Sequence, residues 1–188
     1  HPHPLWTAVH RCGGNQWFYP SVGEAVRPGL MDGMEEYQFS PNTALTRAQA
    51  AQILYNLEGQ PTPTQGSCFP DVIGHWAASA IAWAAQNGVV SGYNNGTFCP
   101  EQGVTRQELA QMMYNYSSYK GRDLSARGDL SLYPDRGKIQ GWALDAMGWA
   151  VGEGLFTGHG NGTIDPESTA TRAQAASLLT KFHQTLRR

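Results

Sequence analysis

The chain has 188 residues, of which 40% are hydrophobic and 15% are charged, a balance typical of a packed globular protein that excludes a disordered tail. Its formal net charge is −2 and its lysines and arginines are scattered, so it has no basic surface for nucleic acid. No run approaches the ~18 apolar residues that a membrane-spanning helix needs, and we expect no membrane insertion.

The N-terminal segment begins at His1 without a methionine, and we expect an upstream signal peptide or passenger domain to be missing from it. It holds four potential metal ligands, His1, His3, His10 and Cys12. Pro2 removes the second-residue amide nitrogen that an N-terminal copper site would use. The cysteines of the chain form no paired Cys-x-x-Cys arrangement. We therefore expect no metal site and no cofactor.

The main signal in the sequence is a threefold internal repeat. Each copy has a Gly-x-x-x-Gly segment, a proline eight residues after the second glycine, and a Thr-Arg pair five residues after the proline. The glycine segments are residues 29–33, 88–92 and 154–158, and the Thr-Arg pairs are residues 46–47, 105–106 and 171–172. We expect three repeats, over residues 1–60, 61–121 and 122–188.

Each copy is predicted to open with a helix that carries an aromatic anchor. Trp17 marks it in the first copy, and the segments 76–83 and 142–149 mark it in the others. In those two segments Trp, Ala and Trp recur at i, i+4 and i+7, which places them on one helical face. Gly88 and Gly154 then stand where a left-handed C-terminal cap is favoured.

A glycine-rich turn and a second helix complete each copy. Asn-Gly at residues 95–96 and 161–162 favours a tight turn between short extended segments. The second helices open with a Thr followed three residues later by Gln49, Glu108 or Gln174, which predicts a capping box in every copy. The helices continue with an apolar stripe at i, i+3, i+4 and i+7 that we assign to the core: residues 50, 53, 54 and 57, then 109, 112, 113 and 116, then 175, 178, 179 and 182.

A unit of about 60 residues is only marginally stable alone, because it buries too little of its surface. Residues 58–66 and 120–123 are predicted linkers that join the units. We therefore expect an all-α domain of three helix–loop–helix repeats, with minor short extended segments, arranged with pseudo-threefold symmetry around a shared core.

The second copy resembles the S-layer homology repeat in residues 69–77 (FPDVIGHWA), 92–100 (GYNNGTFCP) and 104–108 (VTRQE). The resemblance covers almost the whole chain after about residue 10. It implies an extracellular module at the bacterial cell surface, without enzyme activity, that binds an anionic secondary cell-wall polysaccharide, often one bearing pyruvylated N-acetylmannosamine.

The resemblance also implies which residues bind the polysaccharide. In that family the arginine of the Thr-Arg motif contacts the acidic sugar, beside groove aromatics and glycines. Carried over to this chain, the ligand-binding residues are Arg47, Arg106, Arg172, Trp76, Trp142, Asp71, Asp135, Gly92, Gly158 and Tyr93.

Two copies depart from the family pattern. The first copy has Cys12 where the second has Asp71, and the third has His159 where the second has Tyr93. Asp135 also stands two residues further from its tryptophan than Asp71 does. The contacts of these two copies are therefore expected to differ from those of the second.

The position of the arginines supports an anion site on physical grounds. A residue directly after an N-cap stands beside helix amides that lack intrahelical partners and at the positive end of the helix dipole. A guanidinium group adds a planar fork that suits a carboxylate. The alternative is that these arginines pair with carboxylates of a neighbouring repeat and hold the three repeats together.

Two other function classes remain as alternatives. An enzyme needs a convergent acid, base or nucleophile, and neither a nucleophile elbow, a zinc-protease motif nor a phosphate loop is present. A protein-binding module for S-layer lattice assembly, without glycan binding, is the second candidate.

The three cysteines, Cys12, Cys68 and Cys99, leave at least one unpaired within the chain. Cys68 precedes the opening of the second copy, and Cys99 lies in its turn. If these two segments lie side by side, a disulfide between the two cysteines would close a loop of about 30 residues.

Overall fold

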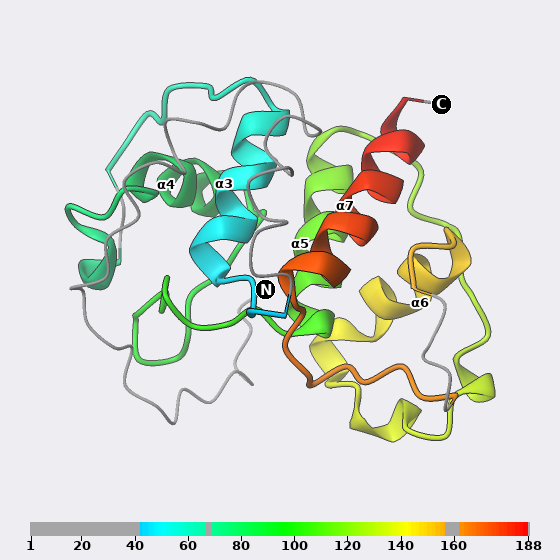
Figure 1. The fold of residues 1–188 in the computed structure, drawn as a ribbon. Coiled ribbons are helices and arrows are strands. Elements are labelled where there is room, and N and C mark those ends of the chain that lie inside the picture. Colours follow the sequence, from blue (N-terminus) through cyan, green and yellow to red (C-terminus); the bar gives the residue numbers. More distant parts are fainter. Residues whose placement is uncertain (1–41, 67–68, 157–161, 188) are drawn as a thin grey trace.

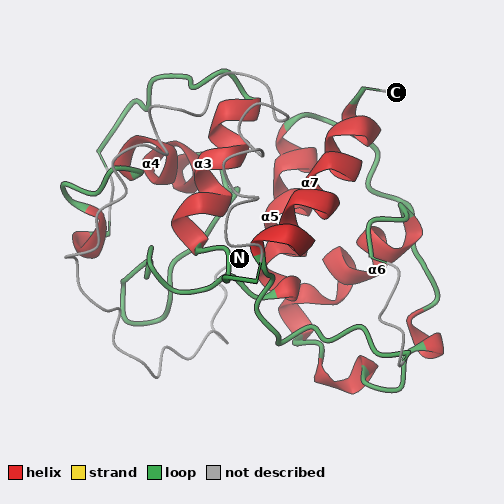
Figure 2. Ribbon diagram, viewed as in Figure 1, coloured by secondary structure: helices red, strands yellow, loops and turns green. Residues whose placement is uncertain are grey.

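The computed structural model describes residues 42–66, 69–156 and 162–187, and this part of the chain contains α-helices, short 3-10 turns and no strand (Figures 1 and 2). The helices are α3 (Arg47–Leu57), α4 (Ala78–Gln86), α5 (Arg106–Tyr119), α6 (Leu144–Gly152) and α7 (Arg172–Leu186). The 3-10 turns are η1 (Pro70–Val72), η2 (Leu130–Leu132), η3 (Arg136–Lys138) and η4 (Gly141–Ala143). The predicted all-α fold is confirmed, while the expected helix around Trp17 lies outside the described residues.

The second helix of each repeat starts with the predicted capping box. At the start of α3, the Thr46 hydroxyl accepts from the amide of Gln49 at 3.1 Å, and the Gln49 side chain accepts from the amide of Thr46 at 2.9 Å. The same reciprocal pair opens α5 and α7. These helix starts are specified locally by the sequence, because all the atoms involved lie within four residues.

The three repeats are joined at the centre by a closed ring of backbone hydrogen bonds. The amide of Leu45 donates to the carbonyl of Ala170 at 2.9 Å, that of Val104 to Leu45 at 2.8 Å, and that of Ala170 to Val104 at 2.9 Å. Each of these residues directly precedes the N-cap threonine of its repeat. Because every repeat donates to one neighbour and accepts from the other, the ring has the pseudo-threefold character that the repeats predict.

Helices pack across the repeat boundaries. The first helix of the second repeat, α4, packs on α3 of the first repeat, and α6 of the third packs on α5 of the second. Equivalent aromatic pairs mark these contacts: Trp83 lies 5.6 Å from Tyr55 and Trp149 lies 5.6 Å from Tyr114, measured between ring centroids. Figure 1 shows α3 with α4 on one side and α6 on the other, with α5 and α7 between them.

One continuous core runs through the described part of the molecule. The apolar stripes predicted for the second helices are buried in it, apart from Leu57, which is partly buried. Phe182 and Tyr116, at equivalent positions of α7 and α5, have ring centroids 6.1 Å apart. The helices of different repeats therefore bury their apolar faces against one another, as expected for units too small to be stable alone.

Cys99 is disulfide-bonded. Both other cysteines lie outside the described residues, so pairing with Cys68 stays a prediction.

We predict that a chain ending at residue 121 folds poorly. It would lack α6 and α7, leave Trp149's partner Tyr114 uncovered, and remove the carbonyl of Ala170 that closes the ring to Leu45. Thermal unfolding followed by circular dichroism should show no cooperative transition near that of the full chain. Melting of the fragment at the full-length temperature would contradict this shared-core architecture.

We also predict that non-reducing digestion yields one peptide pair joined through Cys68 and Cys99. Cys68→Ser should then lower the free energy of unfolding by roughly 3–4 kcal/mol in the chain-entropy account. Mass spectrometry identifies the pair, and a Cys12–Cys99 peptide would show that the predicted pairing is wrong.

Candidate functional site

The N-termini of α3 and α5 are closed by the following repeat. The first amide of α3, from Arg47, donates to the carbonyl of Gln102 at 2.8 Å, and the second donates to Pro100 at 2.9 Å. In α5 the equivalent amides donate to Ser168 and Pro166, each at 2.9 Å. The capping box satisfies the remaining two amides of each helix start. The expectation that unsatisfied helix amides form an anion site is therefore wrong for these two helices.

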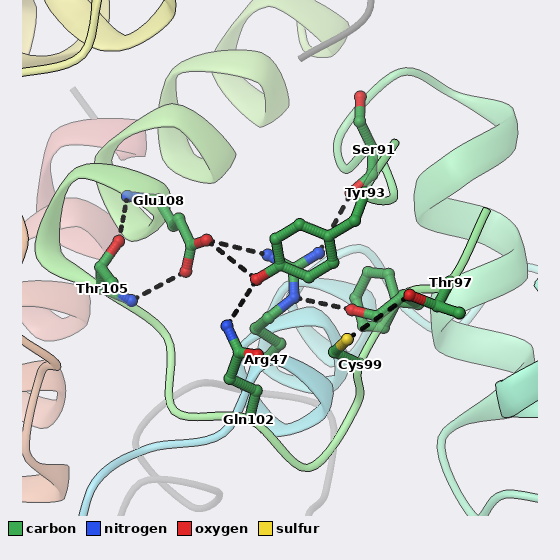
Figure 3. A network of polar contacts seen from close by, with 9 residues as sticks. Arg47, Ser91, Tyr93, Thr97, Cys99, Gln102, Thr105 and Glu108 are labelled. Atoms are coloured by element: carbon green, nitrogen blue, oxygen red, sulfur yellow. Dashed lines mark hydrogen bonds and ion pairs between the residues drawn. The ribbon is translucent and has the colours of Figure 1, made fainter. Parts of the chain in front are cut away.

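The side chain of Arg47 is enclosed by the second repeat (Figure 3). It is 1% exposed, its Nε donates to the carbonyl of Phe98 at 2.8 Å, and its Nη2 donates to the carbonyl of Ser91 at 3.1 Å. The guanidinium carbon lies 4.7 Å from the ring centroid of Tyr93 and 4.4 Å from that of Phe98. Its Nη1 lies 3.5 Å from Oε2 of Glu108. Arg47 thus ties the first repeat to the second, as the alternative interpretation of these arginines expects.

Tyr93 belongs to the same buried network (Figure 3). Its hydroxyl donates to Oε2 of Glu108 at 3.2 Å and accepts from the Gln102 side chain at 2.6 Å. Burial raises the pKa of Tyr93 far above its ordinary value, and the Arg47 charge only partly opposes this. The phenol therefore stays protonated and remains a donor at physiological pH.

Arg106 occupies the equivalent junction between the second and third repeats. Its Nε donates to the carbonyl of Ile164 at 2.9 Å, and its guanidinium carbon lies 4.7 Å from the ring centroid of Phe156. The side chain is 8% exposed, but within the described residues neither terminal nitrogen has a hydrogen-bond or ion-pair partner. Burial lowers the pKa of Arg106, and the charges of Asp165 and Asp135 oppose this shift.

The third arginine, Arg172, is half-buried at the start of α7, and its amide donates to the carbonyl of Thr43 at 2.7 Å. The third repeat is therefore hydrogen-bonded to the first. Gly158 lies outside the described residues.

Asp71 and Asp135 hold the turns into which the arginines insert. Asp71 accepts from the amides of Phe98 and Cys99, the latter at 2.8 Å, and Asp135 accepts from Ile164 at 3.0 Å and Asp165 at 2.8 Å. Cys99 and Asp165 are equivalent residues with positive φ of 59° and 48°. Each carboxylate therefore stabilises a backbone conformation that residues other than glycine rarely adopt.

The two-residue displacement of Asp135 relative to its tryptophan does not change these backbone contacts. Two 3-10 turns follow Asp135, η3 and then η4, which contains Trp142, and they take up the extra length. Desolvation works to raise the pKa of Asp135, but hydrogen bonds from the amides of Ile164 and Asp165 outweigh it and hold the pKa below 3.8.

The remaining predicted residues border the same turn. A side chain at Gly92 would collide with the Phe69 ring and with the carbonyl of Thr97, so this glycine permits close packing of the turn. Trp142 is partly buried and packs against Tyr93 and Cys99, which brings the third repeat to the turn of the second. Trp76 is half-buried beside His75, with ring centroids 5.3 Å apart.

Sequence reasoning missed the role of Glu108 beyond its capping box, and it missed the aromatic rings under the arginines. The signal available was small: Glu108 is acidic where the equivalent Gln49 and Gln174 are neutral. In the described part of the chain, no helix is long and apolar enough to cross a membrane, and no group of potential metal-ligating side chains gathers.

Comparison with known proteins gives three matches to one family. The S-layer homology domain profile matches residues 13–51, 69–110 and 132–176, which together make up more than half of the chain. These ranges contain the three Thr-Arg pairs of the repeat.

Curated relatives include a cellulosome-anchoring protein of Acetivibrio thermocellus, 30% identical over 86% of this chain and 37% of its own length. An endoglucanase of a Bacillus species is 29% identical over 87% of this chain and 17% of its own length. A surface-layer 125 kDa protein of Lysinibacillus sphaericus is 28% identical over 86% of this chain and 14% of its own length. The chain therefore spans between 14% and 37% of these three relatives.

We predict that Asp135→Asn lowers the free energy of unfolding by about 1–3 kcal/mol at neutral pH, because one amide loses its charged acceptor. The folded-state pKa of Asp135 is depressed, so its contribution is present above pH 3.8 and is lost as pH falls through the lower folded-state value. The difference in free energy of unfolding between wild type and variant should therefore become smaller in acid.

Denaturant unfolding at several pH values measures this gap. Asp145→Asn is the matched control, since the Asp145 side chain is 80% exposed and lies 3.8 Å from its arginine partner. A gap that stays constant down to pH 2 would show that the Asp135 carboxylate does not stabilise the turn.

Proposed function

Because this chain belongs to the S-layer homology family, we propose that it is a non-covalent anchoring module that holds a larger exported protein on an anionic polysaccharide of the bacterial cell wall. It acts outside the cell, at the cell surface. The family is a binding module, and we assign the chain no catalytic step.

The observation that carries this proposal is the way in which the Arg106 side chain is held. Its Nε is fixed on a backbone carbonyl and its plane is supported by Phe156, while its terminal nitrogens have no partner within the described residues. A guanidinium group held in this way is preorganised for a two-pronged contact with a carboxylate. Because the group is largely buried, its electrostatic attraction to a bound anion is stronger than the same interaction would be in water.

We propose that the anion is the acidic substituent of a sugar, such as the pyruvyl carboxylate of pyruvylated N-acetylmannosamine. Trp142 and Trp76 supply partly buried indole rings of the kind that pack against sugar faces. We retain Arg172, whose amide is bonded to the first repeat, and Gly158, the sequence equivalent of Gly92, as proposed ligand residues.

Four of the predicted residues are assigned an indirect role. Asp71, Asp135 and Gly92 shape the turns, and the Tyr93 hydroxyl is held by hydrogen bonds with Glu108 and Gln102. We propose that these residues position the binding surface without touching the sugar. Their substitution should therefore change affinity together with stability.

The passenger is proposed from the coverage of the relatives. The cellulosome-anchoring protein and the endoglucanase each extend well beyond the part that matches this chain. We propose that this chain is likewise one part of a longer secreted protein, whose other part performs the activity that is held at the surface.

Co-sedimentation with purified wall sacculi tests the function directly. The fragment should pellet with sacculi, and chemical removal of the non-peptidoglycan polymer should abolish this. A lattice-assembly module without glycan binding would instead pellet equally well with stripped sacculi, or would not pellet at all.

We predict that Arg106→Ala weakens binding to the wall polymer by roughly 1.5–3 kcal/mol, or about ten- to a hundredfold, because the charge-assisted contact is lost. Arg106→Lys should rescue binding only in part, since an ammonium group cannot reproduce the planar fork. Removal of the polymer's acidic substituent should weaken wild type and leave the Ala variant unaffected.

Affinity and melting temperature should be measured on the same samples. Lys181→Ala removes one positive charge from an exposed position of α7 and serves as the matched control. A lower melting temperature with unchanged affinity would mean that Arg106 only joins repeats and that the polysaccharide binds elsewhere.

A further inference from the structure

A pocket of about 170 Å³ lies at the C-terminal ends of α5, α6 and α7. Five of its lining residues are polar: Ser117, Arg122, Asp123, Glu153 and Thr185. The other two are Trp149 and Leu186. The Thr-Arg pairs stand at the opposite ends of α5 and α7, which run side by side in the same direction (Figure 1). Because α5 has 14 residues and is therefore about 20 Å long, the pocket is separate from the site at Arg106.

The equivalent place in the preceding repeat is filled by the protein itself. Equivalent residues of the second and third repeats are 66 positions apart, so Trp83 corresponds to Trp149. The Tyr119 ring lies 5.8 Å from the Trp83 ring, at an interplanar angle of 89°. The next residue, Lys120, has its Nζ 3.0 Å from Oε1 of Glu58. This place therefore holds a six-membered ring against the tryptophan, next to an ammonium group that is paired with a carboxylate.

The third repeat lacks both of these groups. Thr185 takes the place of Tyr119, so the ring is missing. Leu186 takes the place of Lys120, so the ammonium group is missing as well. A cavity of about 150 Å³ in a protein interior can hold benzene, and the pocket therefore has room for one six-membered ring.

The charges around the pocket favour a cation. Asp123 and Glu153 supply two carboxylates, and neither has an ion-pair partner in the described part of the chain. Arg122 supplies one positive charge, and its Nη2 donates to the carbonyl of Thr185 at 3.0 Å. The C-terminal ends of three helices add partial negative charge. An ammonium group is therefore more favourable here than a carboxylate.

The polar lining favours a ring that carries hydroxyl groups. Pockets for apolar ligands are lined mainly by hydrophobic side chains, whereas most of this lining can form hydrogen bonds. Trp149 is 2% exposed, and its indole nitrogen has no hydrogen-bond partner among the described residues. The wall therefore combines an aromatic ring with an unused donor.

We propose that this pocket is a second ligand site, which binds a hexosamine with a free amino group. The pyranose ring occupies against Trp149 the place that the Tyr119 ring occupies against Trp83, and its ammonium group pairs with Glu153 and Asp123. The site does not depend on the proposed function. Together with the site at Arg106, it would hold an acidic sugar and an amino sugar at opposite ends of the same two helices.

NMR titration of the full chain with D-glucosamine tests the site, with glucose and N-acetylglucosamine as neutral comparisons. D-glucosamine should shift the indole N–H resonance of Trp149, which the spectrum of Trp149→Phe assigns. It should bind roughly three- to tenfold more tightly than either neutral sugar, because only it carries the ammonium group. Equal binding of the three sugars, or no binding of D-glucosamine, would overturn the proposal.

Thr185→Tyr should close the pocket by supplying the ring that Tyr119 supplies in the second repeat. We expect it to weaken D-glucosamine binding at least tenfold without lowering the melting temperature. Gln184→Tyr adds the same ring at the neighbouring exposed position, outside the pocket, and should bind like wild type. Unchanged affinity in folded Thr185→Tyr would show that the sugar binds elsewhere.

Glu153→Gln keeps the test decisive if Thr185→Tyr does not fold. It removes one carboxylate with little change of shape, and it should reduce the preference for D-glucosamine over glucose. Glu167→Gln removes the same charge at an exposed position outside the pocket and should keep the preference. An unchanged preference in Glu153→Gln would contradict the proposed ammonium contact.

Arg106→Ala separates this inference from the proposed function. It should bind D-glucosamine like wild type even where it no longer binds the wall polymer, because the two sites lie at opposite ends of α5. Loss of D-glucosamine binding in folded Arg106→Ala would overturn the second site, whereas failure of wild type to bind the wall polymer would leave it standing.

Discussion

The structure depends on an arginine that crosses from one repeat into the next. In both described junctions its Nε donates to the carbonyl of a turn residue, Phe98 or Ile164, that lies more than 50 residues along the chain. Burying a guanidinium group without any hydrogen bond is costly, so the turn must present that carbonyl in a fixed place for Nε. Asp71, Asp135 and Gly92 meet this requirement, because each holds its turn in the shape that the arginine needs.

This dependence explains why the repeats fold together. The arginine belongs to one repeat, the turn and the aspartate that clamps it belong to the next, and α4 or α6 of that next repeat packs back on the helix that carries the arginine. The backbone amides of the arginine and of the residue after it also donate to carbonyls of the following repeat. The unit that recurs in the sequence is therefore different from the unit that packs in space.

The sequence predicted the features whose partners lie nearby in the chain. Capping boxes and apolar stripes depend on residues within one or two helical turns, and Thr105 with Glu108 or Leu109 with Met112 could be assigned without a structure. The partners of the arginines could not be assigned from the sequence, because the spacing of the Thr-Arg pairs does not indicate which turn each arginine contacts. The error on the helix amides has the same origin: their acceptors, such as Gln102 and Ser168, are distant in sequence and become visible only in the fold.

The hydrogen bonds among Leu45, Val104 and Ala170 have a consequence for how such proteins diversify. In an open array of repeats, a copy can be added at either end, because the last copy leaves an unused edge for the next. Here the third copy donates to the second and accepts from the first, and no edge of that ring is left over. A single copy added by gene duplication would therefore find no free donor or acceptor in this ring, whereas a further set of three copies could form a ring of its own.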